Sequence, residues 1–148
     1  MKRDENIVTL SRDHHTALLF CWKIRQGIKR KVPTERIHTY VQYFWNNHLE
    51  QHFKEEETIL FAAIQDSLCE QAIAEHKELR KTIAATATTD NLNLLADTLD
   101  NHIRFEERIL FPHLEKILAE ETLAAIGKRL QAMHETHPKD LYADEFWV

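Results

Sequence analysis

The chain has 148 residues, a length typical of one compact domain, and we expect residues 1–148 to fold as a single unit. Its 43% hydrophobic content excludes intrinsic disorder, and only 2 Gly and 3 Pro argue against a turn-rich β-sandwich or barrel. A net charge of -5 offers nothing to attract nucleic acid or an anionic membrane, and no apolar run of about 18 residues suggests a membrane helix. We therefore expect a few long helices in a cytoplasmic protein without an export signal.

Hydrophobic periodicity predicts four long helices that are joined by short polar turns. Pro112 must end or kink the fourth of them, because proline lacks an amide hydrogen. The expected N-caps are Ser11, Ser67 in a capping box with Glu70, and Asp90. The expected ranges are about 11–30, 34–65, 67–88 and 90–112.

Short connections force consecutive helices to alternate in direction, which predicts an all-α, up-down-up-down four-helix bundle over about 11–118. An additional C-terminal helix and tail should occupy about 119–148, with the aromatic end of the tail packed on the bundle. Cys21 and Cys69 lack metal-binding or redox spacing, so we expect reduced, packed thiols.

One ten-residue pattern occurs twice, fifty positions apart. Segments 52–61 and 102–111 both read His-x-x-x-Glu-Glu-x-Ile-Leu-Phe. A His and a Glu four residues apart lie about 40° apart around a helix, so both can reach one metal ion. Both pairs interrupt an apolar stripe and should therefore face the interior. The pairs are His52 with Glu56, and His102 with Glu106.

The other two helices each carry one His on an apolar stripe. The first helix offers His14 or its neighbour His15, of which His14 follows the stronger apolar phase, and the third helix offers His76. Antiparallel helices bring residues to one height when they are equally far from the connecting turn, and by this measure all the candidates share one layer. Ile73 and Ile109 are expected to continue the buried stripes.

These side chains are candidate metal ligands. A charged Glu on an apolar stripe costs several kcal/mol without a cationic partner, which argues for a bound cation. Imidazole and carboxylate ligands suit iron, manganese and zinc, and the absence of Cys argues against a structural zinc site. A pair of iron ions is favoured over zinc or manganese. The six candidates are His14, His52, Glu56, His76, His102 and Glu106.

The repeated motif, with single His residues on the intervening helices, resembles the hemerythrin-like HHE cation-binding family up to about residue 118. The resemblance implies a non-haem di-iron centre, oxo- or hydroxo-bridged, that is held by these six residues inside the bundle. Oxygen-carrying members have a fifth His one turn beyond the third-helix His, where this chain has Arg80. The chain is more similar to the bacterial branch linked to iron-centre repair and nitrosative stress, although it lacks that branch's Cys-bearing N-terminal module.

The sequence thus predicts a protein that binds or reacts with small molecules such as O2, NO or peroxide, or that handles iron, in a stress response. Enzymatic turnover and any protein partner are left open. One alternative is a metal-dependent sensor or regulatory interaction module without turnover of its own. A metal-free helical bundle is the other.

Three further groups of residues have weaker signals. His48, one turn before His52, is expected to be a hydrogen-bonded boundary residue rather than a ligand. Glu57 and Glu107 either orient ligand imidazoles by accepting their second N–H or form a solvated acidic face, and both interpretations stay open. Surface positions are expected for His38, His113, His134 and His137.

Overall fold

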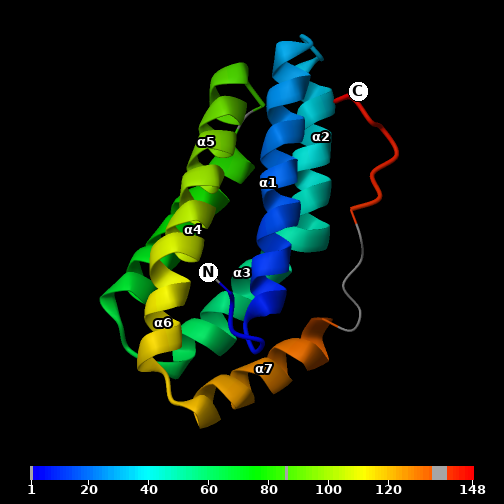
Figure 1. Cartoon of the computed structure of the whole chain (residues 1–148). Coiled ribbons are helices and arrows are strands. Elements are labelled where there is room, and N and C mark those ends of the chain that lie inside the picture. Colours follow the sequence, from blue (N-terminus) through cyan, green and yellow to red (C-terminus); the bar gives the residue numbers. More distant parts are fainter. Residues whose placement is uncertain (1, 86, 135–139) are drawn as a thin grey trace.

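The computed structural model describes residues 2–85, 87–134 and 140–148, and these ranges contain helices and no strand. Four helical rods alternate in direction and a further helix crosses one end of the bundle (Figure 1). The predicted all-α bundle with an additional C-terminal helix is confirmed. The elements are α1 (Val8–Lys29), α2 (Thr34–Phe44), η1 (Trp45–Leu49), α3 (Glu50–Glu55), η2 (Glu56–Leu60), η3 (Phe61–Ala63), α4 (Ser67–Ala84), α5 (Thr89–Phe105), η4 (Glu106–Leu110), α6 (Phe111–Ile117) and α7 (Glu120–His134).

Two of the four rods are composite. The second rod runs from α2 through η1, α3, η2 and η3, and the fourth runs from α5 through η4 into α6. Segments η1, η2 and η4 are π-helical: the amide of Phe61 donates to the carbonyl of Glu56, and the amide of Phe111 donates to that of Glu106. A π-helical turn inside an α-helix is rare and is frequently found at functional sites. Both η2 and η4 begin at the first Glu of the repeated motif.

The first helix starts earlier than predicted. It begins at Val8, so Ser11 lies within the helix and is not its N-cap. The Ser11 hydroxyl instead donates to the Glu107 carboxylate at 2.7 Å. Residues just before the predicted start, such as Ile7, are part of the buried core.

The caps of α4 and α5 also lie one and two residues before their predicted positions. Asp66, and not Ser67, accepts a hydrogen bond from the amide two residues later, at 2.9 Å. Thr88, and not Asp90, accepts one from the amide three residues later, at 3.1 Å. Both caps have extended backbone angles, which aim the side-chain oxygen at the first helical turn.

Pro112 does not end the fourth rod. It is the second residue of α6, two positions after the last residue of η4, and the helix continues to Ile117. In the π register the amide that proline lacks would have bonded to the carbonyl of Glu107. The Arg3 guanidinium donates to that carbonyl instead, at 2.9 Å.

Two apolar clusters fill the bundle, and the candidate ligands lie between them along every rod. On α1, for example, His14 separates Leu10 of one cluster from Ala17 of the other. The first cluster contains the aromatic core near the α1–α2 turn, and the second lies toward α7. The large members of the first include Phe20, Tyr40, Phe44, Phe53 and Leu95, and those of the second include Leu60, Phe61, Leu110, Phe111 and Leu114.

Helix α7 crosses the end of the bundle and contacts η2 and α1 (Figure 1). Its buried residues, among them Ile126, belong to the second cluster together with Ile59 of η2. The residue equivalent to Ile59 in the other repeat, Ile109, is 53% exposed, and Ile73 is exposed too, so both predicted burials are wrong. The same Ile of the motif is therefore buried in the first copy and exposed in the second.

The C-terminal tail packs against α1 and α2, as predicted. Phe146 and Trp147 are buried in the first cluster. Lys23 lies with its ammonium 3.1 Å from Asp140 and 4.2 Å from the centre of the Trp147 ring, and the Tyr40 hydroxyl donates to Asp140 at 2.6 Å. The side chain of His134, and His137 altogether, lie outside the described residues.

Both cysteines are buried and free. Among the described residues, no helix combines the length and the apolar character that crossing a membrane requires.

Candidate metal centre

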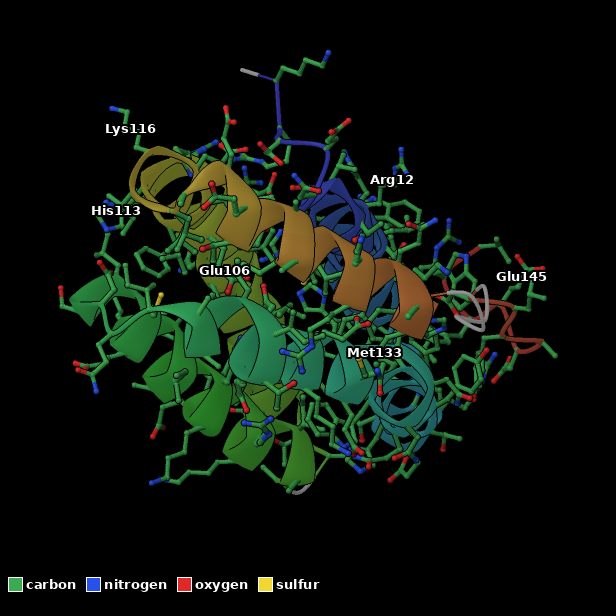
Figure 2. The ribbon with its side chains drawn as sticks, turned by 90° about the horizontal axis from the view of Figure 1, so that it is seen from below. Arg12, Glu106, His113, Lys116, Met133 and Glu145 are labelled. Carbon is green, nitrogen blue, oxygen red and sulfur yellow. The ribbon has the colours of Figure 1, made fainter. Side chains whose placement is uncertain are left out.

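Six side chains from the four rods meet in one buried layer. Each of them is at most 4% exposed. The structure brings together all six predicted candidates, and it places His14 in the layer while His15 is exposed. Figure 2 views the molecule from the end that α7 crosses, with Glu106 among the helices. The residues are His14 on α1, His52 on α3, Glu56 on η2, His76 on α4, His102 on α5 and Glu106 on η4.

The layer consists of two overlapping groups, each with ligand atoms within 4.8 Å of one another. The first group contains His14 and His52, and the second contains His76 and His102. Glu56 and Glu106 belong to both. Each group thus has two imidazoles of its own and shares two carboxylates with its neighbour, so each can hold one cation.

The imidazole Nε2 atoms all face the two shared carboxylates. The distance from His14 Nε2 to Glu106 Oε1 is 2.9 Å, and that from His76 Nε2 to Glu56 Oε1 is 3.0 Å. His52 and His102 each lie 3.3 Å from the glutamate four residues further on. These short contacts bring four lone-pair donors and two carboxylates toward common points.

Most of these inward-facing atoms have no hydrogen-bond partner among the described residues. They include both oxygens of Glu56, Oε2 of Glu106, and Nε2 of His52, His76 and His102. Burying a polar atom without a partner costs free energy, and six in one layer are a heavy cost for so small a domain. A cation bound in each group would ligate them all, so the donor set fits metal ions.

On its outer side, each imidazole contacts a further carboxylate through Nδ1. A proton fixed at Nδ1 leaves the Nε2 lone pair free for a metal and holds the ring in place. The four contacts are His14 with Glu107 at 2.8 Å, His52 with Asp13 at 3.0 Å, His76 with Glu57 at 2.6 Å and His102 with Glu75 at 2.7 Å.

These contacts decide between the two interpretations of Glu57 and Glu107, which hold imidazoles rather than form a solvated face. Sequence analysis missed the other two acids, Asp13 and Glu75. A signal for them exists, because an acid directly precedes the single His of both α1 and α4.

The layer has two halves: α1 and the second rod build one, and α4 and the fourth rod build the other. The outer contacts of the imidazoles repeat from one half to the other. In each half, the acid before the single His contacts the motif His of the same half: Asp13 contacts His52, and Glu75 contacts His102. The second Glu of each motif contacts the single His of the other half: Glu57 contacts His76, and Glu107 contacts His14. The two imidazole pairs have nearly equal spacing, with ring centres 4.9 Å apart for His14 and His52 and 4.8 Å apart for His76 and His102. The layer therefore has approximate two-fold symmetry.

The carboxylates raise the pKa of every imidazole in the layer. Burial lowers the pKa of His52, yet the charge of Glu56 and the hydrogen bond to Asp13 raise it to about 10. The pKa of His102 is raised to about 9 in the same way, against burial, by Glu106 and its outer acid. Burial raises the pKa of Glu56, but the surrounding imidazoles hold it well below its usual value. The layer thus favours positive charge, either as protons or as metal ions.

Aromatic rings cover the layer. Phe53 stacks on His76 with ring centres 3.9 Å apart, and Phe111 stacks on His14 at 5.3 Å. These walls limit contact with bulk water. His48 is buried against Phe44, at 5.0 Å, and belongs to neither group.

The sequence profile of the Hemerythrin HHE cation binding domain matches residues 6–114. The chain belongs to this hemerythrin family. The matched span contains all six residues of the layer and ends before α7. Comparison with curated proteins and with solved structures gives no significant match. Family membership and the two buried His/Glu groups together make metal binding the function of this hemerythrin domain.

Proposed function

We propose that this hemerythrin domain holds two iron ions, one in each group, and uses them to bind or react with a small molecule such as O2, NO or peroxide, or to handle iron, under stress. One observation carries the proposal: both groups contain the same two carboxylates, Glu56 and Glu106. A carboxylate has two oxygens and can bridge two ions, as in carboxylate-rich dinuclear sites of helical bundles.

The donor set favours iron. Imidazole nitrogen and carboxylate oxygen suit iron, manganese and zinc, while thiolate, the ligand typical of structural zinc sites, is absent from both groups of the described residues. Six carboxylates surround four imidazoles that are neutral when they bind metal. Two multivalent cations compensate this negative charge better than one.

The residues have separate tasks. His14 and His52 would hold one ion and His76 and His102 the other, each fixed by its outer carboxylate, while Glu56 and Glu106 would bridge the pair. The bound iron pair supplies redox electrons and coordination positions that the six side chains do not fill. The aromatic rings around the layer exclude bulk water, so that only small molecules can reach the ions.

The shared carboxylates give a direct test. The full-length chain, reconstituted anaerobically with ferrous iron and desalted, is expected to retain about two iron ions per chain by elemental analysis. Glu56→Ala and Glu106→Ala should each lose both ions, because each removes a ligand from both groups, whereas His52→Ala should keep the second group intact. Glu78→Ala, which removes an exposed acid of α4, is the matched control and should retain both ions.

Two results would contradict the proposal. Unchanged iron content in both Glu variants would show that the layer is not the site, and recovery of zinc alone from cells would exclude the redox role. Spectra of the loaded protein with O2, NO and peroxide then identify the small molecule. A partner that is captured only without chelator, together with no spectral response, would favour the sensor alternative.

A further inference from the structure

One difference between the two halves of the layer lies directly behind a ligand. Arg80 on α4 follows His76 by one turn, and the equivalent position on α1, one turn after His14, is Leu18. The ligand set does not require a cation at this position. The contacts of Arg80 show what it does there.

Arg80 contacts both groups that hold the outer side of His76. Its guanidinium donates to both oxygens of Glu57, at 3.0 and 3.2 Å, and one of these oxygens is 2.6 Å from Nδ1 of His76. The same guanidinium lies 5.5 Å from the centre of Phe53, the ring that stacks on His76. Arg80 is thus one contact away from the imidazole on two sides.

The other half has a differently balanced arrangement. Glu107 holds His14, and its nearest cation is Arg3, 3.7 Å away. Arg3 donates at 2.8 Å to a second acid, Glu115, so that two carboxylates share one guanidinium. Among the ion pairs of the described residues, Arg80 has Glu57 alone. The surroundings are therefore less negative behind His76 than behind His14.

Electrostatics predicts which of the two groups this difference in charge weakens. A carboxylate that accepts a hydrogen bond from Nδ1 makes an imidazole a stronger metal ligand. A guanidinium that donates to the same carboxylate reduces this gain in ligand strength. The positive charge of the guanidinium, whose side chain is 36% exposed, also repels a cation held by His76, and solvent screens this repulsion in part. Both effects act more strongly on the second group, where Arg80 donates to both oxygens of Glu57, than on the first, where Arg3 is 3.7 Å from Glu107.

We propose that Arg80 is a positioning residue that makes the two ion positions unequal, so that the position of His76 and His102 binds its ion more weakly and releases it first. The inference rests on the proposed dinuclear site. It gives the pair a division of roles, in which the His14 position retains its ion and the His76 position exchanges its ion.

The test is an anaerobic titration of the metal-free full-length chain with Co2+, followed by its visible spectrum and repeated against a competing chelator. Two binding steps are expected in the wild type. Arg80→Gln keeps an amide donor for Glu57 but removes the charge, and should tighten the weaker step about tenfold. Arg80→Lys keeps the charge and should preserve the wild-type separation. Arg25→Gln, which removes a cation paired with Asp97 and Asp100 on the bundle surface, should change neither step.

Two ligand variants assign the steps to the positions: His102→Ala should remove the weaker step and His52→Ala the tighter one. Any of three results would overturn the role of Arg80 while the dinuclear site stands. These are binding of both ions in a single step, an unchanged separation of the steps in Arg80→Gln, and the same behaviour in Arg80→Lys as in Arg80→Gln. A chain that binds no metal would overturn both the site and the inference.

Discussion

The two halves of this bundle present the same kinds of ligand, but different parts of the chain pack behind them. Each half contributes two imidazoles, one shared carboxylate and two outer acids, at closely matching distances. Behind the ligands the halves diverge, because α7 covers η2 but leaves Ile109 of η4 exposed, and the tail packs on α1 and α2. The comparison shows that the chemistry of the layer needs a strict pattern, whereas its packing support does not.

The largest expected effect is that of pH on the metal-free protein. Folding raises the pKa of His52 to about 10 and that of His102 to about 9. An imidazole whose pKa is raised by folding stabilises the folded state fully at pH values below its unfolded-state pKa of about 6.5. This contribution is lost as the pH rises through the folded-state pKa. Between pH 7 and 9, the free energy of unfolding should fall by about 1.4 kcal/mol per pH unit for each imidazole that stays protonated only when folded.

Urea denaturation of the metal-free chain at several pH values measures this fall, and NMR titration shows whether His52 and His102 keep their protons above pH 7. Metal affinity should change in the opposite direction, because ligation needs neutral imidazoles and therefore strengthens as pH rises. Metal-free stability that rises from pH 7 to 9 would contradict the arrangement of charges in the layer.

The tail gives the next largest effect, and it packs on α1 and α2. Phe146 is buried beside Gly27 and Ile37, with its ring 5.5 Å from that of Tyr40. Phe146→Ala should lower the free energy of unfolding by about 3 kcal/mol, because it leaves a cavity in the first cluster. Val148→Ala, at a 73% exposed position, is the control and should have little effect. A loss below about 1 kcal/mol would mean that the tail is not a structural part of the bundle.

The outer acids allow the halves to be weakened one at a time. Asp13→Asn should weaken the ion of the first group, and Glu75→Gln that of the second, each by about 10- to 100-fold, because the imidazole loses its charged acceptor. Chelator competition with each variant measures the change. If both variants weakened the same ion, the division of the layer into two groups would be wrong.

The smallest effect lies in the turn between α1 and α2. Lys31 has a φ of 57°, a left-handed conformation that glycine adopts without strain, whereas the α4–α5 turn leaves its helix through extended backbone at Ala85. Lys31→Gly should therefore stabilise the protein by about 0.5 kcal/mol in denaturation experiments. Lys29→Gly, at the last residue of α1, should instead destabilise it by up to about 1 kcal/mol. Destabilisation by both variants would show that the turn gains nothing from glycine.

The sequence indicated the bundle and the six inward residues because helical periodicity and the repeated motif act over many positions. Exact helix starts were less predictable, since adjacent residues compete for one capping role and the backbone angles decide between them, as with Asp66 and Ser67. The choice of His14 over His15 followed from the apolar phase. The burial of Ile109 was mispredicted because periodicity does not reveal which motif copy a later helix covers.

The π-helical turns at Glu56 and Glu106 have a practical consequence for protein engineering. Each turn accommodates one extra residue, so the same rod presents a ligand pair to the layer and then continues with its faces turned by about 100° relative to a regular α-helix. A designer who grafted the His-x-x-x-Glu pair onto straight helices of an artificial scaffold would place the carboxylates correctly and misdirect the apolar residues that follow. The transplanted unit has to be the pair together with its widened turn.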